Sequence, residues 1–340
     1  MYCMLRILDK NKVPVKGLKK YTDLCIESAL ELDDRTLSFS APYRNIRNAI
    51  ENEGYIETKD DRYVVKEIEK TSGGTAKIRA QLDLESLEGK AFREFRSEEQ
   101  TIRNALQLAF AGTGWTIGIC EVSKKRTLSM SNVSALDVLK QALKTYRCEI
   151  TINSKDQIIH IYTSVGEDKG CYFSNQLNLT KLTVQSTSYD FYTEIEPYGK
   201  DGLTIESVND GKTYLENHQY SSKVKRCIWK DERYTVPESL KEDAEAKLDE
   251  LSKPYRSYTA EIINLVEAVQ DEEKKEQYKE VFSIALGDTV LLISKSTGIR
   301  ESHRIVKFYE YPLTKEKNKV ELANTRLSFE EVQRTEQELS

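Results

Sequence analysis

The sequence predicts an α+β fold that is mostly β and contains more than one domain. Short apolar runs with period two, separated by turn residues, fill both ends of the chain and are typical of small β domains. Helical periodicity is confined to a central stretch and to one later helix. The chain has 340 residues. Because single hydrophobic cores stop growing near ~250–300 residues, we expect at least two domains.

Residues 1–92 are expected to form the first β domain. Polar and apolar residues alternate from Tyr21 to Leu30, and the turn Lys59-Asp60-Asp61 separates two runs as in a hairpin. Gly73-Gly74 breaks the chain, and period two then returns at Ala76, Ile78, Ala80 and Leu82. Short strands joined by turns in this way predict a small barrel or sandwich.

Residues 93–168 change character and predict a small α+β domain. Ser97 and Gln100 have the spacing of a capping box, and apolar residues follow at helical intervals as far as Gly112-Thr113-Gly114. Ser134 and Asp137 precede a second helix with the same spacing. Alternating segments predict strands at residues 115–119, 149–152 and 157–162, the last two joined as a hairpin.

The second half returns to β structure with one helical interruption. Pro237 suits the first turn of a helix, and Ser252-Lys253-Pro254 ends it. Between them lies an apolar stripe of Leu240, Ala244, Leu248 and Leu251. Strands are predicted at residues 177–184, 189–197, 203–208, 289–294, 303–309 and 319–322, and a charged linker at 271–275.

These patterns divide the rest of the chain. A second β domain is expected in two segments, 169–230 and 276–327, with an inserted helix–strand domain at 231–275. Residues 328–340, rich in Glu and Gln, are expected to form an exposed tail. Because runs of short strands lie on both sides of the central α+β segment, we predict that the two β domains share one topology through internal duplication.

Composition excludes several classes of function. The net charge is −5 without a basic block, which argues against tight binding to duplex DNA. No apolar run approaches the ~20 residues needed to span a bilayer, so stable membrane insertion is not expected. The cysteines lie far apart at positions 3, 25, 120, 148, 171 and 227. This spacing predicts free thiols in a soluble protein assembled in the cytoplasm.

No grouping of residues predicts a catalytic, cofactor or metal site. His160 lies close in sequence to Cys171 and Ser174, but a nucleophile and its base are recognised by mutual geometry, and His160 falls on an alternating strand. The three histidines, His160, His218 and His303, lack metal-ligand spacing.

The paired acids and the glycine-rich loops also have simpler explanations. Asp33-Asp34 and Asp60-Asp61 occur at turns, where Asp forms local hydrogen bonds. Gly73-Gly74-Thr75 and Gly112-Thr113-Gly114 do not continue into a phosphate-binding motif. We predict turn and helix-end roles for both loops.

One ordered set of segments carries a resemblance to a known family. The chain resembles the N-terminal structural region of the tail-associated (Tal) proteins, the prophage tail endopeptidase family of siphophages that infect Gram-positive bacteria. That region is related to the baseplate hub of contractile-tail phages. The segments that carry the resemblance are Gly54–Ile56, Asp61–Ile68, Thr193, Glu196–Gly202, Ile228–Asp231, Pro237–Leu240, Gly287–Val290 and Tyr309–Leu313.

The resemblance implies a baseplate-hub-like architecture with two β-barrel-like tube domains and two small α+β domains. It implies a virion structural protein at the tail tip that forms a homotrimer, with pseudo-sixfold symmetry from its six tube domains. The implied partners are the distal tail protein, the tape-measure protein and receptor-binding or fibre proteins, with DNA only as passing cargo at ejection. An acidic balance is compatible with such a conduit.

The resemblance does not imply an enzyme here. Longer family members carry a peptidoglycan-cleaving or fibre-like extension, whereas this sequence stops soon after Val320–Asn324. No catalytic residue of the family can be matched to a position in this chain. Two alternatives stay open: a tail-tip cell-wall hydrolase (a peptidoglycan endopeptidase), and a module that binds host-surface carbohydrate.

Overall fold

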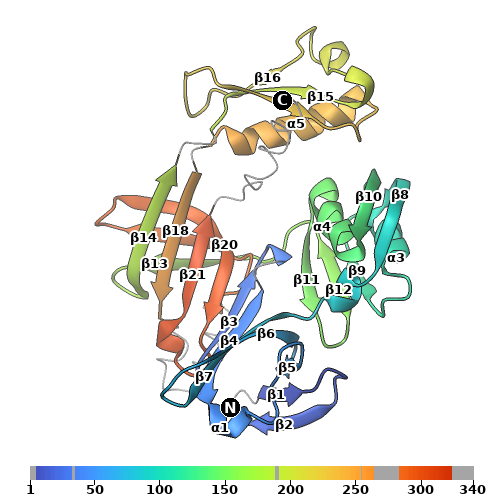
Figure 1. The fold of residues 1–340 in the computed structure, drawn as a ribbon. Coiled ribbons are helices and arrows are strands. Elements are labelled where there is room, and N and C mark those ends of the chain that lie inside the picture. Colours follow the sequence, from blue (N-terminus) through green and yellow to red (C-terminus); the bar gives the residue numbers. More distant parts are fainter. Residues whose placement is uncertain (1–4, 33–34, 188–190, 254, 264–282, 324–340) are drawn as a thin grey trace. The chain divides into compact units, whose positions relative to one another are not determined.

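The computed structural model describes residues 5–32, 35–187, 191–253, 255–263 and 283–323. Most regular structure in these residues is strand, with few helices, which confirms the predicted α+β, mostly β class (Figure 1). Contacts divide the chain into two compact units, residues 1–182 with 260–321, and residues 183–259 with the segment from 322 onward.

The first β domain is one antiparallel run of strands in the order β3-β4-β7-β6-β5-β1-β2. Its predicted alternation is confirmed, because Ala76, Ile78, Ala80 and Leu82 on β7 are all buried while the residues between them are more exposed. The predicted hairpin also forms, with Tyr55 opposite Val64. The elements are β1 (Leu5–Leu8), β2 (Pro14–Leu18), β3 (Thr22–Ala29), β4 (Thr36–Pro42), α1 (Tyr43–Ile46), β5 (Tyr55–Glu57), β6 (Arg62–Lys70), β7 (Thr75–Leu82) and α2 (Glu85–Glu88).

The α+β domain combines a two-stranded ribbon, two helices and a three-stranded sheet (Figure 1). The ribbon pairs β8 with β10, and the sheet has the order β11-β12-β9, in which β12 and β9 run parallel. Its elements are β8 (Ala91–Thr101), α3 (Ile102–Phe110), β9 (Thr116–Cys120), β10 (Lys125–Ser134), α4 (Ala135–Tyr146), β11 (Glu149–Asn153) and β12 (Ile158–Tyr162).

The first helix of this domain begins later than the capping-box spacing predicted. Ser97 and Gln100 lie on β8, and Thr101 caps α3 by accepting a hydrogen bond from Asn104 N. Ser97 is buried opposite Leu128 of β10. The prediction of a cap at Ser97 was therefore wrong, because pairing with a strand distant in sequence overrode a local signal.

The second helix begins as predicted. Ser134 Oγ accepts a hydrogen bond from Asp137 N at 3.1 Å, and Asp137 Oδ2 accepts one from Ser134 N at 2.8 Å. At the far end of α4, the hydroxyl of Tyr146 donates to the carbonyl oxygen of Gln100 at 2.6 Å. Helix α4 is thus fastened at both ends.

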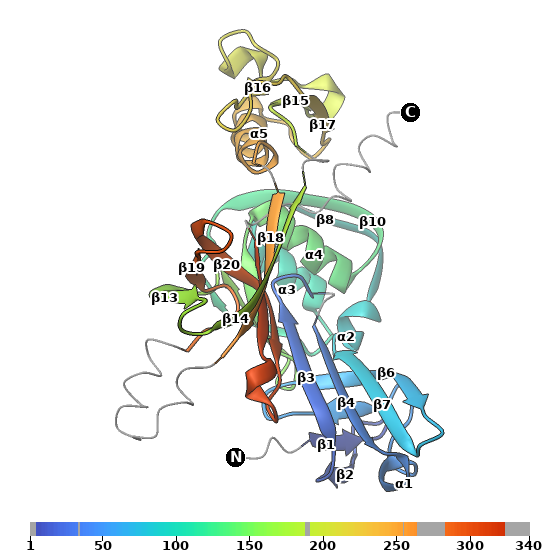
Figure 2. The same cartoon turned by 90° about the vertical axis from the view of Figure 1, so that its left-hand side faces the viewer.

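The second β domain continues the sheet of the first. Strand β20 pairs antiparallel with β3, placing Lys307 opposite Ala29 and Glu310 opposite Ile26. Figure 2 shows these two strands side by side. The sheet continues in the order β20-β21-β18-β14, with β19 and β13 beyond β20. The strands are β13 (Asp168–Ser174), β14 (Leu179–Thr187), β18 (Tyr255–Ile262), β19 (Thr289–Ser294), β20 (Ile299–Glu310) and β21 (Lys319–Ala323), with a 3₁₀ turn η4 (Lys315–Lys317).

Neither β domain is a closed barrel in the part of the chain that the structure describes. The path of paired strands through the large sheet ends at β14 and β2, and no pairing among the described residues joins these ends. At the centre of the large sheet, the edge strand β3 of the first domain pairs with β20 of the second. These two edges therefore join the domains to each other instead of closing each domain on itself. The similarity of the two topologies stays a prediction.

The inserted domain is larger than the sequence predicted. Strands at residues 194–230, expected in the second β domain, form a separate sheet against helix α5. Strand β18, expected in the insert, pairs instead within the large sheet. The apolar stripe of α5 needs a sheet to cover it, and the strands that precede it in sequence supply one. The elements are β15 (Glu194–Tyr198), η2 (Lys200–Gly202), η3 (Glu206–Val208), β16 (Leu215–Glu216), β17 (Arg226–Lys230) and α5 (Pro237–Leu251).

Further predictions in this half have mixed outcomes. Helix α5 begins at Pro237 and buries Leu240, Ala244, Leu248 and Leu251, as predicted. The strand predicted at 203–208 is wrong, because this segment contains the 3₁₀ turn η3. The linker 271–275 and the tail 328–340 lie outside the described residues.

Candidate functional site

A bidentate ion pair joins the α+β domain to the second β domain. Arg304 on β20 donates to both carboxylate oxygens of Glu149 on β11, each at 2.8 Å. Arg304 also donates to the Val165 carbonyl oxygen at 2.9 Å, and Glu149 accepts from Val165 N at 2.8 Å. The hydrogen bond to Glu149 raises the pKa of Arg304 above its usual range. The pair therefore fixes one geometry at this junction.

Two glycines allow backbone segments to cross beside this pair. A Cβ on Gly166 would lie 2.1 Å from the carbonyl carbon of Gly287, and both glycines have a positive φ. Asp288, which is 3% exposed, accepts hydrogen bonds from Glu167 N at 2.9 Å and Ala285 N at 2.8 Å. Gly287–Val290, one of the segments that carry the family resemblance, therefore lies where two backbone segments cross.

A second junction joins the α+β domain to the first β domain. Ser154, which is fully buried, donates from both N and Oγ to Asp61 Oδ1 at 3.0 Å. Its hydroxyl oxygen also accepts from Arg62 N at 2.8 Å. Asp61 was predicted to make local turn hydrogen bonds, yet its carboxylate accepts hydrogen bonds from Ser154, which lies 93 residues away in the sequence. No local sequence signal could have identified this pair.

Charged groups cluster next to this second junction. Glu57 and Asp83 are only 5% and 4% exposed, and Arg62 contacts them at 3.3 and 3.7 Å. Lys12 contacts Asp83 at 2.8 Å. Each buried carboxylate thus has a cationic partner, as buried charges require, and the cluster has a structural role.

His160 and His303 lie on strands, and each contacts a neighbouring group of the protein. His160 Nδ1 accepts a hydrogen bond from Ile119 N at 2.9 Å, which ties β12 to β9. A Cβ at Gly118 would lie 2.5 Å from the His160 ring, so the glycine makes room for it. His303 is 5% exposed on β20, with Nε2 at 3.3 Å from the Glu301 carboxylate.

The cysteine and serine that lie near His160 in sequence are not arranged as a nucleophile and base. Both Cys171 and Ser174 lie on β13, in the large sheet, whereas His160 lies in the sheet of the α+β domain. Burial, and then the charge of Asp288, raise the pKa of the Cys171 thiol, which disfavours the reactive thiolate. The described cysteines carry free thiols, as predicted: Cys25, Cys120, Cys148, Cys171 and Cys227.

The glycine-rich loops have the predicted turn roles. Gly74 has φ +77° in the turn between β6 and β7, and Gly112 and Gly114 have φ +80° and +89° after α3. Asp33-Asp34 lies outside the described residues.

Two family-like segments of the inserted domain pair as the parallel strands β15 and β17, and they also contact the rest of this domain. A Cβ at Gly199 would lie 2.6 Å from the Tyr234 carbonyl oxygen. The Tyr234 hydroxyl donates to Asp243 on α5, and burial raises its pKa. The Lys247 ammonium lies 4.9 Å from the centre of the Trp229 ring. These contacts give Gly199, Tyr234 and Trp229 packing roles within the inserted domain.

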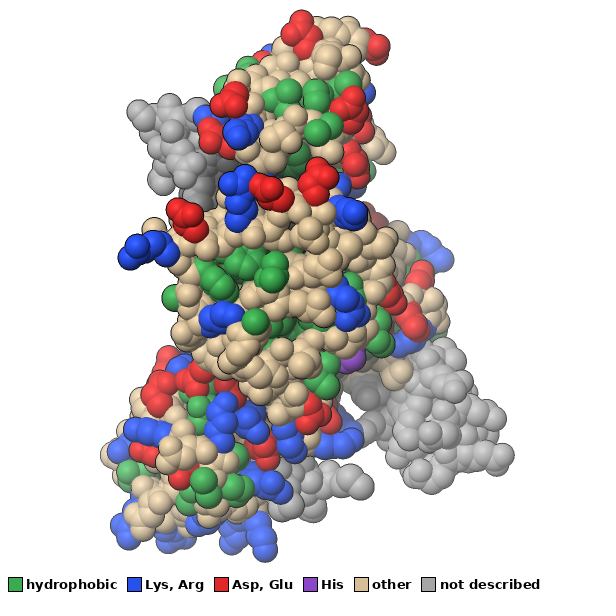
Figure 3. Space-filling view, turned by 90° about the vertical axis from the view of Figure 1, so that its right-hand side faces the viewer, with side chains coloured by type: hydrophobic (Ala, Val, Ile, Leu, Met, Phe, Trp, Pro, Cys, Tyr) green, Lys and Arg blue, Asp and Glu red, His purple; other side chains and the backbone are tan. Residues whose placement is uncertain are grey.

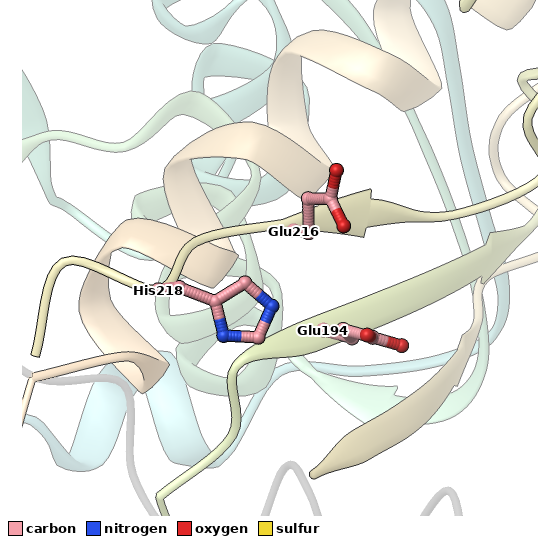
Figure 4. A group of neighbouring side chains, drawn as sticks. All are labelled: Glu194, Glu216 and His218. Atoms are coloured by element: carbon pink, nitrogen blue, oxygen red, sulfur yellow. The ribbon is translucent and has the colours of Figure 1, made fainter. Parts of the chain in front are cut away.

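One mixed group of ligand-type side chains does converge in the inserted domain. Glu194, Glu216 and His218 each place one carboxylate oxygen or ring nitrogen within 4.8 Å of the others (Figure 4). The spacing argument in the sequence did not identify this group, because the antiparallel pairing of β15 with β16 creates it.

Charged side chains of both signs share the surface. On the face drawn in Figure 3, Lys and Arg side chains lie among Asp and Glu side chains. Among the described residues, no helix combines the length and the apolar character needed to cross a bilayer.

Family models cover nearly the whole chain. The prophage endopeptidase tail N-terminal domain matches residues 5–81, the prophage endopeptidase tail domain matches 91–163, and the prophage endopeptidase tail model matches 167–333. No curated protein sequence matches the chain.

Solved structures of tail proteins share the fold. Prophage tail protein gp18 from Listeria monocytogenes is 15% identical, with a TM-score of 0.71 over 99% of both chains. The 43 kDa tail protein of prophage MuSo2 from Shewanella oneidensis is 10% identical, with a TM-score of 0.66 over 96% of this chain and 98% of that one. A tail protein from Neisseria meningitidis is 9% identical, with a TM-score of 0.64 over 95% and 96%. With its fold and the family models in agreement, the chain belongs to the prophage endopeptidase tail family of tail proteins.

Proposed function

We propose that this chain is the hub at the distal tip of a phage or prophage tail, where three copies form a ring that closes the tail tube. The observation that carries the proposal is the β3–β20 pairing, which joins two β domains edge to edge within one protomer. Among the described residues, β14 and β2 end the strand path, and their outer edges offer backbone groups that neighbouring copies can cover. A closed ring covers them by one repeated contact.

The proposed partners follow from this position. The ring binds the distal tail protein, contacts the tape-measure protein, anchors receptor-binding or fibre proteins and gives passage to DNA at ejection. Assembly takes place in the host cytoplasm and the finished protein lies at the virion tail tip. A reconstruction of the tail tip tests the proposal: three copies at this position support it, and one or six contradict it.

The second candidate function is cell-wall hydrolysis, which the endopeptidase name of the family model favours. We propose that this chain lacks that activity, since Cys171 and His160 lie in different sheets. The test is a zymogram on purified peptidoglycan with and without added Zn²⁺, using the wild type and His-to-Gln variants at 160, 218 and 303. Clearing by the wild type that one variant abolishes would establish the enzyme and contradict the structural role.

A further inference from the structure

Two carboxylates of the inserted domain face each other across paired strands. Glu194 on β15 lies directly opposite Glu216 on β16 in the antiparallel register. Like charges in directly opposed positions destabilise such a pair of strands. Glu194 is only 5% exposed, so solvent screens it poorly. This placement favours a cation between the two side chains.

The neighbouring arginine and lysine side chains contact only one oxygen of each of these two carboxylates. Arg226 contacts a single oxygen of Glu194, Oε2, through Nε and a terminal nitrogen, both at 2.7 Å. It also reaches Glu196 at 3.4 Å, so its charge is shared. Lys212 contacts Oε1 of Glu216 at 3.1 Å on the open surface. Within the described residues, no hydrogen bond reaches the remaining oxygens, Glu194 Oε1 and Glu216 Oε2.

His218 supplies an independent indication of a metal ligand. Its Nδ1 lies 3.1 Å from the Ser221 carbonyl oxygen, which can only accept, so Nδ1 donates this hydrogen bond and Nε2 is the ring nitrogen left to meet a ligand. Metal-ligating histidines commonly donate their second ring nitrogen to a backbone carbonyl in this way. In Figure 4, the imidazole turns its other nitrogen toward the side on which the two carboxylates lie.

We propose that Glu194, Glu216 and His218 bind one Zn²⁺ ion. One imidazole nitrogen and two carboxylate oxygens suit this ion, and water completes its coordination. The ion offsets the opposed charges and fastens the segment after β16 to β15. The spacing of the histidines in the sequence predicted no metal site, so this proposal differs from that prediction. It does not depend on the proposed role as a tail hub.

The test is calorimetric titration of the untagged full-length chain with Zn²⁺, together with thermal unfolding in its presence and absence. The wild type should bind one equivalent and unfold at a higher temperature with Zn²⁺, since binding to the folded state stabilises it. H218A and E216Q should each weaken binding by at least ~10-fold and remove the shift. These exposed positions are preferred to Glu194, which also holds Arg226.

Matched controls separate this site from other binding. E245Q removes an exposed carboxylate from α5, and H160Q removes a histidine of another domain, so both should bind Zn²⁺ like the wild type. Titration with Co²⁺ shows whether a cysteine participates, because a thiolate ligand adds a charge-transfer absorption band. Absence of binding, binding that H218A and E216Q leave unchanged, or a thiolate band with Co²⁺ would each overturn the proposal.

Discussion

At the scale of single residues, glycines at backbone crossings explain part of the family-like sequence. We predict that G166A destabilises the protein by about 1–3 kcal/mol more than G170A, the usual cost of overpacking. Both glycines have a positive φ, +81° and +72°, so strain from the left-handed conformation is common to the two. Only at Gly166 would a Cβ meet the backbone, whereas nothing lies within 4 Å at Gly170. Equal thermal unfolding midpoints of the two variants would contradict this explanation.

Two serines with similar local patterns should respond differently to mutation. S134A should cost about 1 kcal/mol, the typical effect of losing an N-cap. S97A should be neutral or slightly stabilising, because Ser97 Oγ is buried on β8 without a hydrogen-bond partner among the described residues. Chemical denaturation of both variants checks this, and a larger loss for S97A would show that the hydroxyl has an unrecognised partner.

At the scale of elements, the N-terminus of α4 should make a pH-dependent contribution to stability. Hydrogen bonds from Ser134 lower the pKa of Asp137 below the ordinary value of an aspartate. A lowered carboxylate pKa in the folded state stabilises above the unfolded pKa and is lost as the pH falls through the folded value. The stability difference between the wild type and D137N should therefore be largest near neutral pH and shrink below about pH 4. Thermal unfolding across this range measures it, and a constant difference would refute the assignment.

The junction between β11 and β20 should depend on arginine geometry. R304A should destabilise the protein by about 1–3 kcal/mol, since it leaves the Glu149 carboxylate without its charged hydrogen bonds. R304K should recover only part of this loss, because lysine cannot form the bidentate contact. R300A, which changes an exposed arginine on the same strand, is the control and should lie within ~0.5 kcal/mol of the wild type. An effect of R300A as large as that of R304A would contradict a specific junction.

At the scale of the whole molecule, the prediction concerns assembly. Three copies should form the ring, each contact burying more than ~1,000 Å², as specific interfaces do. The isolated protein can dissociate by mass action, so light scattering should show the mass rising with concentration. A mass that stays monomeric at high concentration, together with a tail-tip reconstruction without threefold symmetry, would exclude the ring.

The sequence by itself determined what depends on local periodicity and local hydrogen bonds. It predicted the mostly β class, the alternating strand β7, the capping box at Ser134 and the helix that begins at Pro237. Each of these predictions depends on a signal that lies within a few neighbouring residues. The tertiary structure alone decided the start of α3, the sheet that covers α5, and the union of β3 with β20. It also decided the contacts of Glu149 with Arg304, 155 residues apart, and the approach of His218 to Glu194. Pairing between distant strands sets these features, and the energy of such pairing is not encoded in any local pattern.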